Sequence, residues 1–562
     1  MKKQSYKSLA AVAVTAMALT GCKLIGDLEY TVTPDPVEMH GDSVKVSVTV
    51  KVPEKGLHKK ASAEITPKLG NHAFKTVYIQ GEKATGNGQV IPKKAGGTVN
   101  YTDVIPYASD MEHADLMVSG MAKKGKKEIE IEAVKIADGT IVTPLLVQPD
   151  DKALMATDNF VRTTEEVYSA QIHYLKGKSN VRSSEMSDQD IKDLQTWMAA
   201  AQTNPKVAPK KVNLVSYASP EGEVDMNENL ASDRAKSGEE AAKNVFEKAQ
   251  FEMPENFFNQ MPKGEDWAGF KIAVEKSDLE DKDLILRILT MYSNVKERET
   301  EIRKLAKTYV ELERKDILPS LRRTQINVIY DQIGWSDEEL KELSKTKPDT
   351  LSVEELLFTA TLYEDLSEKM RIYNLVVQYY PEDWRGHNNV GYVYYQQNDL
   401  DNAKKNFEKA NGLNESAITL NNLGILARIN GDRDKATELL NSAVSAGSEV
   451  KYNLGIIDIQ NGDYSEAIGN MGDNKTFNKA LAQVLNKDYS AALGTVDASP
   501  DAESAMGYYL KAIIGARQDN LDMVVNNLKS AIAKDSSLKS KAAKDREFIK
   551  FFENASFQNV TK

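Results

Sequence analysis

Apolar and polar residues alternate one by one along much of the first 150 residues. The stretch from Ser43 to Val52 places every valine on one face, and Glu128 to Val134 repeats the pattern. A period of two is typical of strands with one face in a core and the other in water. Turn signals at residues 86–88 and 95–97 separate several short strands. The pattern therefore predicts an all-β, antiparallel sandwich over residues 30–150.

Strands of this length and spacing suit a single immunoglobulin-like domain. Such a domain is usually a spacer or a docking module. No cluster of side chains in this domain indicates a ligand, so we assign it no binding residues.

Residues 158–335 mix the two periodicities and predict an α+β domain. Residues 166–175 and 211–216 have strand character. Helical patterns begin near Ser187 and near Asn227, and the first is preceded by an arrangement close to a capping box. A largely helical insertion is expected between residues 246 and 319.

Two segments of this region resemble the OmpA-like domain, a periplasmic module that holds peptidoglycan. The strand at 211–216 continues into the loop YASPEG (217–222) and the helix start NENLASDRA (227–235), similar to the family's Asn-x-x-Leu-Ser-x-x-Arg-Ala. Residues 321–328, LRRTQINV, are similar to its last strand, Asn-Arg-Arg-Val-Glu-Ile. The loop looks like the version common in Bacteroidota. The resemblance implies an OmpA-like domain with a helical insertion.

The same resemblance implies candidate peptidoglycan-binding residues: Ser219, Asn227, Arg234 and Arg322. In the family, a loop aspartate and a helix arginine clamp the charged ends of diaminopimelate. Arg234 and Asn227 match, but Ser219 stands where the aspartate belongs, and its loss removes a contact of about 1.5–3 kcal/mol. Glu221 or Asp225 are substitutes from the same loop. A purely structural role for Arg234 is equally open.

Residues 352–557 contain an internal repeat. Gly391, Gly424 and Gly455 recur at spacings of 33 and 31 residues. Alanines at 403, 436 and 467 recur at the same spacings, and polar turns fall between the paired helices, at 397–399, 430–432, 461–463 and 486–488. The period indicates a solenoid. The pattern resembles the tetratricopeptide repeat and predicts an all-α solenoid of five to six repeats.

Solenoids of this kind bind polypeptide on an extended concave surface. Mapping the repeat from its glycines selects the partner-binding candidates Asn388, Tyr392, Tyr395, Asn421, Arg428 and Tyr452. Ile425, Ile456 and Ile459 fall on the same stripe but fit a core position equally well. Tyrosine and arginine dominate binding hot spots, which makes this face the predicted partner site.

The first residues resemble the signal of a bacterial lipoprotein. Three lysines precede an apolar run from Ser8 to Leu19, which ends in Leu-Thr-Gly-Cys22, and Cys22 is the only cysteine. The run is too short to span a bilayer and fits a cleaved signal peptide. The resemblance implies a signal peptide at 1–21, lipid such as palmitate on Cys22, and a tether at 22–29. The alternative is an ordinary signal peptide with an incidental cysteine.

Sorting rules for such lipoproteins use the residue after the lipidated cysteine. An aspartate there retains the protein in the inner membrane, and this chain has Lys23. We therefore expect the outer membrane, with the periplasmic face preferred over the cell surface.

Composition excludes several classes of function. A net charge of -11 argues against nucleic acid as a partner. The six histidines are scattered, no phosphate-binding loop or nucleophile elbow occurs, and we expect no metal, no cofactor and no catalytic residue. Carboxylate pairs such as Glu165 with Glu166 and Asp188 with Asp190 fit solvated or capping groups better than acid–base chemistry. The protein is not expected to be an enzyme.

Together these features predict a non-catalytic outer-membrane lipoprotein. It would act as a protein-binding scaffold or adaptor in an envelope assembly or secretion complex. The alternative is a structural anchor that ties the outer membrane to peptidoglycan through the OmpA-like domain. The two differ in whether the wall-binding site works.

Overall fold

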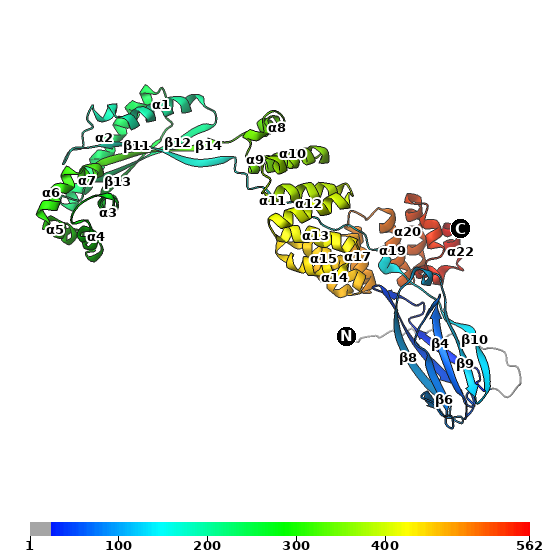
Figure 1. Cartoon of the computed structure of the whole chain (residues 1–562). Helices are drawn as coiled ribbons and strands as arrows, with labels where there is room; N and C mark the ends of the chain where they lie inside the picture. Colours follow the sequence, from blue (N-terminus) through cyan, green and yellow to red (C-terminus); the bar gives the residue numbers. More distant parts are fainter. Residues whose placement is uncertain (1–23) are drawn as a thin grey trace, which may run out of the picture. The chain divides into compact units, whose positions relative to one another are not determined.

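The computed structural model describes residues 24–562 (Figure 1). Cys22, the signal peptide and the first tether residues lie outside this range. The chain divides into two compact units: one joins the residues up to Thr157 with Glu364–Lys562, and the other is Asp158–Tyr363. No helix within residues 24–562 combines the length and the apolar composition that crossing a bilayer requires.

The first unit begins with a β-domain of two sheets. Its strands are β1 (Glu29–Thr33), β2 (Met39–His40), β3 (Ser43–Val52), β4 (Ser62–Leu69), β5 (His72–Ala73), β6 (Val77–Gly81), β7 (Gln89–Ile91), β8 (Gly97–Pro106), β9 (Leu116–Lys124) and β10 (Lys127–Ala137). One sheet has the order β1-β3-β2, with β8 also paired to β3, and the other has β10-β9-β4-β6-β7, with β5 on β4. The pairs are antiparallel except β6 with β7.

The alternating pattern of β3 builds the core of this domain. Its valines are buried and the residues between them are not, so one face of the strand is dry. Side chains from both sheets join these valines in one apolar cluster. The last strand ends at Ala137, short of the expected boundary at residue 150. Residues 147–157 belong to no strand or helix, and we call them the strap.

The strap is followed by the second unit, the middle unit. Its elements are β11 (Thr163–His173), α1 (Gln189–Thr203), β12 (Val207–Ala218), α2 (Val224–Lys248), β13 (Phe258–Glu265), α3 (Trp267–Lys276), α4 (Lys282–Met291), α5 (Val295–Arg303), α6 (Ala306–Arg314), α7 (Ile317–Leu321), β14 (Arg323–Ile333), α8 (Asp337–Thr346) and α9 (Val353–Thr361). The sheet order is β11-β14-β12-β13. Only the β12–β13 pair is parallel.

Strand β13 lies inside the stretch where the sequence predicts a helical insertion. Its sequence, FNQMPKGE, has no β-branched residue, and it contains a proline and a glycine. It is nevertheless an edge strand, which tolerates proline because one side of its backbone needs no partner. Helices α3 to α7 follow it and form a separate apolar cluster around Phe270 and Leu312.

The rest of the first unit is a helical solenoid. Its helices are α10 (Leu366–Tyr379), α11 (Trp384–Gln396), α12 (Leu400–Leu413), α13 (Ala417–Ile429), α14 (Arg433–Ser442), α15 (Ser448–Asn461), α16 (Tyr464–Met471), α17 (Phe477–Leu485), α18 (Tyr489–Asp497), α19 (Ala505–Arg517), α20 (Leu521–Lys534), α21 (Leu538–Ala542) and α22 (Ala555–Thr561). Helix α9, which the repeat analysis places at the start of the solenoid, groups with the middle unit.

The repeated glycines set how closely paired helices approach. A Cβ atom on Gly391 would lie 2.7 Å from the Phe407 ring, and one on Gly424 would lie 2.8 Å from Leu440 Cγ. A Cβ atom on Gly455 would lie 2.8 Å from Met471 Cγ. Any larger residue at these positions would push the second helix of the pair away. The sequence period is therefore a packing requirement.

Candidate functional site

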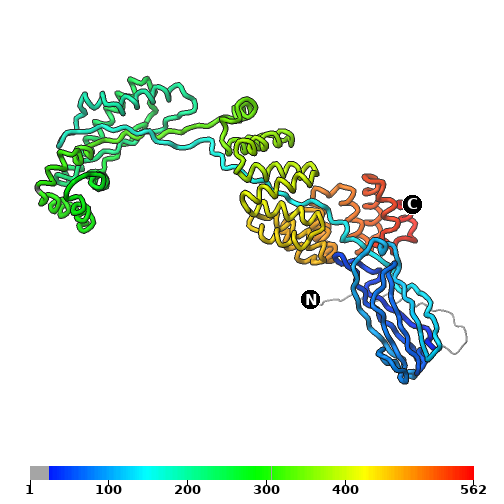
Figure 2. The backbone as a smooth tube through the Cα atoms, in the orientation of Figure 1, coloured from blue at the N-terminus to red at the C-terminus, as the bar shows by residue number. Residues whose placement is uncertain are grey.

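The strap runs in an extended course along the solenoid, which Figure 2 shows as a cyan thread beside the helices. Helices α11, α13, α15 and α17 contact it, and we call the face that they present to it the groove. The strap itself forms no helix or strand. Pro149 lacks a backbone N–H and biases Gln148 before it toward extended backbone. The strap's backbone therefore has no partners within a helix or sheet, and side chains of the solenoid supply them.

Four solenoid asparagines grip the strap's backbone, one each from α11, α13, α15 and α17. Each side chain accepts a hydrogen bond from the N–H of one strap residue and donates one to the C=O of the same residue. The pairs are Asn478 with Gln148 (2.7 and 2.8 Å), Asn453 with Lys152 (2.7 and 3.1 Å), Asn422 with Leu154 (2.8 and 2.8 Å) and Asn389 with Ala156 (2.8 and 2.9 Å). Lys152, Leu154 and Ala156 are two residues apart and Gln148 lies four before Lys152, so all four face the same way in an extended chain.

A second row of amides joins the first into a ladder. Asn388 donates to the Leu154 carbonyl at 3.1 Å, and Asn421 donates to that of Lys152 at 3.0 Å. The rows are linked between helices, because Asn422 donates to Asn388 and Asn453 donates to Asn421. A buried polar network whose members are all bonded holds one arrangement.

Two adjacent strap carboxylates have separate receptors. The Tyr452 hydroxyl donates to both oxygens of Asp150, at 2.9 and 2.7 Å, and Asn478 donates to one at 2.6 Å. Arg428 grips Asp151 through Nε, at 2.6 Å, and through Nη2. The Asp151 side chain is 0% exposed. Burial raises the pKa of its carboxyl, and the Arg428 guanidinium opposes that rise.

Apolar contacts and a hydrogen bond at the C-terminal end of the strap complete the site. Leu154 packs against the buried cluster that contains Leu440 and Ile457. Leu146, just before the strap, belongs to the largest solenoid cluster. At the far end, Arg385 donates to the Thr157 carbonyl at 3.4 Å.

The predicted partner-binding residues lie largely in this groove. Asn388, Asn421, Arg428 and Tyr452 all bond to the strap, and the Tyr395 hydroxyl donates to the Asp151 carbonyl at 3.4 Å. Tyr392 instead packs beside the cluster of Ala403, Phe407 and Leu426, and Ile425, Ile456 and Ile459 are core residues. The strap therefore already occupies the side chains that were predicted to bind a separate partner protein.

The sequence reasoning missed the asparagines that make the two-point contacts. Their signal was present, because Asn389 and Asn422 follow the predicted Asn388 and Asn421 and recur at the repeat spacing. Asn453 likewise follows Tyr452. No periodicity marks the occupant, since the strap has neither helical nor strand patterning.

The β-domain also contacts the solenoid directly. The Gly41 N–H donates to the Tyr464 hydroxyl at 3.1 Å, and the rings of Tyr464 and His40 are 4.9 Å apart. Asp42 pairs with Arg433, and Asp115 pairs with Arg546. These contacts bring the start of the strap to the solenoid.

The four predicted wall-binding residues lie in the middle unit, and all are buried. Arg234 donates to three backbone carbonyls, those of Lys178 (3.0 Å), Tyr217 (2.8 Å) and Leu175 (3.2 Å). Its side chain sits between β12, α2 and the segment after β11, and burial lowers its pKa to about 10. These contacts make it a brace between backbone segments.

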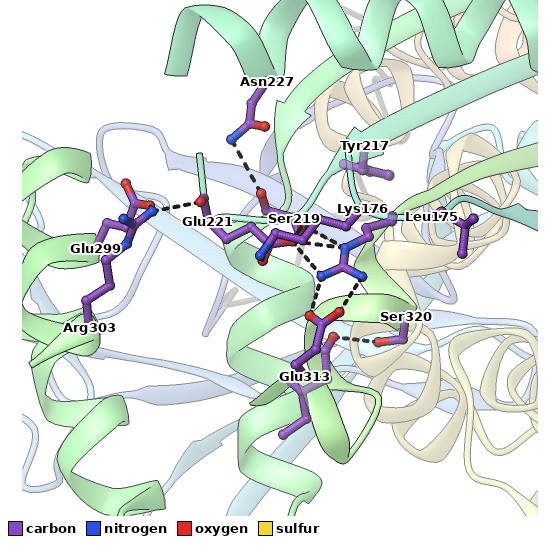
Figure 3. A network of polar contacts seen from close by, with 12 residues as sticks. Leu175, Lys176, Tyr217, Ser219, Glu221, Asn227, Glu299, Arg303, Glu313 and Ser320 are labelled. Carbon is purple, nitrogen blue, oxygen red and sulfur yellow. Dashed lines mark hydrogen bonds and ion pairs between the residues drawn. The ribbon is translucent and has the colours of Figure 1, made fainter. Parts of the chain in front are cut away.

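Arg322 pairs with the carboxylates of Glu221 and Glu313, both of which Figure 3 labels. It donates to Glu221 through Nε (2.9 Å) and Nη2 (2.6 Å), and to Glu313 of α6 through Nη1 (2.9 Å) and Nη2. Lys176 pairs with Glu221 at 2.7 Å. Burial alone would raise the pKa of Glu221, but Lys176, Ser219 and Arg322 lower it overall.

Ser219 and Asn227 complete this cluster. The Ser219 hydroxyl donates to Glu221. The Asn227 amide donates to the Ser219 carbonyl at 3.4 Å and to Glu265 at 2.7 Å. The structure thus brings Ser219, Asn227 and Arg322 together, and Glu221 supplies a carboxylate from the loop that holds Ser219. That carboxylate is already bound by the protein's own cations.

No group of three His, Cys, Asp or Glu side chains in the described part of the chain is arranged to hold a metal ion.

Comparison with known proteins supports the reading of the solenoid. Residues 385–416, which span α11 and α12, match the family described as tetratricopeptide repeat. The solenoid contains tetratricopeptide repeats. A 111-residue stretch is 29% identical to the BBSome complex member BBS4 of Bos taurus, over 19% of this chain and 21% of that protein. The chain thus matches about a fifth of the length of that relative.

Solved structures with some likeness have low sequence identity and low TM-scores. One, from a functional characterisation of Pseudomonas aeruginosa pilF, is 15% identical with a TM-score of 0.29 and covers 38% of this chain and 97% of the other. Another is YrrB, described as a tetratricopeptide-repeat protein with an unusual peptide-binding site. It is 17% identical with a TM-score of 0.22, over 37% of this chain and 99% of that one.

Proposed function

We propose that this protein is a non-catalytic scaffold, anchored to the outer membrane by lipid on Cys22, that binds envelope proteins through its tetratricopeptide-repeat unit. It would serve an assembly or secretion complex on the periplasmic face. Cofactors, metals and nucleic acid have no part in this role.

One observation carries the proposal. The solenoid groove holds an extended backbone with paired amides from four successive repeats. Side chains that bond N–H and C=O of one residue recognise polypeptide as such, whatever side chains it bears. This is the chemistry of a protein-binding module, and it supports a scaffold over an enzyme.

The anchor is tested by Cys22→Ala. The wild type should take up labelled fatty acid and sediment with outer membranes, because acyl chains bury many methylenes at about 0.8 kcal/mol each. The variant should take up no label and leave the membrane fraction. A wild type without label that still sediments would overturn the lipid anchor.

The scaffold role is tested by crosslinking and co-purification from detergent-solubilised membranes. The wild type should yield at least one envelope protein in a fixed ratio, and the purified partner should rebind full-length Cys22→Ala protein in solution. This rebinding step shows whether the Cys22→Ala protein still binds the partner when it is no longer attached to the membrane. Failure to find any partner in a fixed ratio would contradict the scaffold.

Anchoring to peptidoglycan is the second candidate, and one observation keeps it testable. Of the two carboxylates on Arg322, Glu221 is buried, whereas the Glu313 side chain is 45% exposed. A wall carboxylate would have to replace Glu313. Wild-type protein and Glu313→Gln should therefore be compared for co-sedimentation with purified sacculi. Binding gained or strengthened in Glu313→Gln would favour the anchor, and no binding in either would exclude it.

A further inference from the structure

We infer that the solenoid groove is a selective site for an extended peptide with two adjacent carboxylates, and that residues 147–157 are its tethered ligand, closing it to other peptides in the intact chain. This inference deepens the proposed protein-binding role and rests on it. The partner chemistry is that of the strap itself: an extended segment with an Asp-Asp pair.

The strap is held as a ligand is held. The N–H and C=O groups of Gln148, Lys152, Leu154 and Ala156 bond to asparagine side chains of the solenoid. An ordinary connector satisfies its backbone with water or its own turns. Here the receptor groups come from four different repeats, at positions that the repeat itself reproduces.

The acidic pair makes the site selective. A two-point amide contact accepts any residue, but Arg428 meets the Asp151 carboxylate with two donors in a site that water does not reach. Tyr452 and Asn478 meet Asp150. A peptide with amides in place of these carboxylates would leave Arg428 buried without a counter-charge, which is strongly unfavourable.

The groove also needs an occupant. Asn388, Asn421, Asn422 and Asn453 are buried, and each donates to a strap carbonyl. Without the strap these amides would have to bond to water in a surface shaped for backbone. A peptide of the same pattern restores the bonds.

Tethering explains why the intact chain should be closed. The strap is continuous with the β-domain, whose Gly41 and Asp42 bond to the solenoid, so its start is already placed. A segment linked in this way has an effective concentration in the millimolar range or above. A free peptide with the same contacts cannot compete at micromolar concentration.

The test uses full-length protein and a fluorescent peptide of residues 147–157. The peptide should not bind the wild type, and it should bind a full-length variant whose residues 148–157 are replaced by a Gly-Ser segment of equal length. A peptide carrying Asp151→Asn should bind that variant at least tenfold more weakly. In the same background, Asn453→Ala should weaken binding, whereas Asn441→Ala, exposed on α14, should not.

Equal binding to wild type and strap variant would overturn closure. Equal binding of the Asp151→Asn peptide would overturn selectivity. Because no envelope partner is used, these failures are distinct from failure of the scaffold proposal.

A second measurement covers a strap variant that does not fold. Hydrogen exchange of the wild type should show that strap amides open more readily than the core of α13, as a separable ligand would. If strap amides and α13 amides exchange only when the whole solenoid unfolds, the strap is an integral part of the solenoid's fold. That result would overturn the inference.

Discussion

The solenoid groove and the Arg322 cluster of the middle unit are both filled by the protein's own groups, but in different ways. The groove is filled by a backbone segment, with amides reading N–H and C=O and one fully buried ion pair. The Arg322 cluster is filled by side chains, one of them half-exposed. An occupied site still shows what it binds when the occupant has the chemistry of a ligand. The strap backbone has the chemistry of a peptide ligand. Glu221 and Glu313 only balance the charge of Arg322.

The strongest test of this contrast is Arg428→Ala. It leaves Asp151 buried without its partner and should lower the free energy of unfolding of the solenoid by about 3–5 kcal/mol. Urea-dependent hydrogen exchange, read from peptides of α13, would measure this. Lys435→Ala is the control, since it breaks an exposed pair with Glu438 on α14 and should cost under about 1 kcal/mol. Equal effects from the two variants would show that the groove pair is no tighter than a surface pair.

Arg322→Met should have a smaller effect on the middle unit, about 2–3 kcal/mol. Glu221 keeps Lys176 as a partner, and Glu313 can turn to water. The readout is the same exchange experiment on peptides of β12. Glu313→Gln, as control, should cost under about 1 kcal/mol. A cost from Arg322→Met as large as that of Arg428→Ala would erase the difference between the two sites.

Asn422→Ala removes one two-point contact and should destabilise the strap and its helix by about 1–2 kcal/mol. The N–H of Leu154 would lose its partner, and its C=O would keep only Asn388. Strap amides should therefore exchange faster, while β-domain amides stay unchanged. Asn441→Ala should have no measurable effect. If strap exchange stays the same in Asn422→Ala, the ladder does not hold the backbone.

The smallest effect concerns pH and the carboxyl of Asp458 on α15. Burial raises its pKa to about 6 from 3.8, and Asn470 opposes this with a hydrogen bond. The nearby acids Glu466 and Asp463 raise it further. Since the folded state keeps this proton to a higher pH than the unfolded state does, stability falls as pH rises from about 4 to 6.

Asp458→Asn should therefore remove that pH dependence. The variant should match the wild type below pH 4 and exceed it at pH 7 by about 1 kcal/mol, a value reduced for partial exposure. Melting curves across this range provide the measurement. Parallel pH profiles for wild type and variant would contradict the assignment.

Several parts of the molecule follow from local pattern. The alternation of residues 43–52 predicts a half-buried strand, because period two allows only one arrangement of faces. The repeated glycines predict close helix pairs, and the residues that would meet their Cβ atoms lie at the expected separation. The Asn388, Asn421, Arg428 and Tyr452 positions follow from the same repeat.

Other parts do not follow from pattern. Strand β13 escaped prediction because an edge strand needs only one neighbour and few β-formers. Helix α9 has the repeat's helical character but packs with the middle unit. The internal partners of Arg234 are backbone carbonyls, and any sequence provides those.

The repeat spacing alone predicts part of the groove, namely Asn388, Asn421, Arg428 and Tyr452, because helix periodicity and repeat spacing are local properties of the chain. The wall-binding candidates follow only from the resemblance of a strand, a loop and a helix to the OmpA-like domain, and their wall binding stays a prediction. What these side chains bind depends on which distant segment the fold brings to them. The strap carries no periodic signal, and its asparagine partners lie hundreds of residues away, so the contacts between them exist only once the solenoid has folded around it.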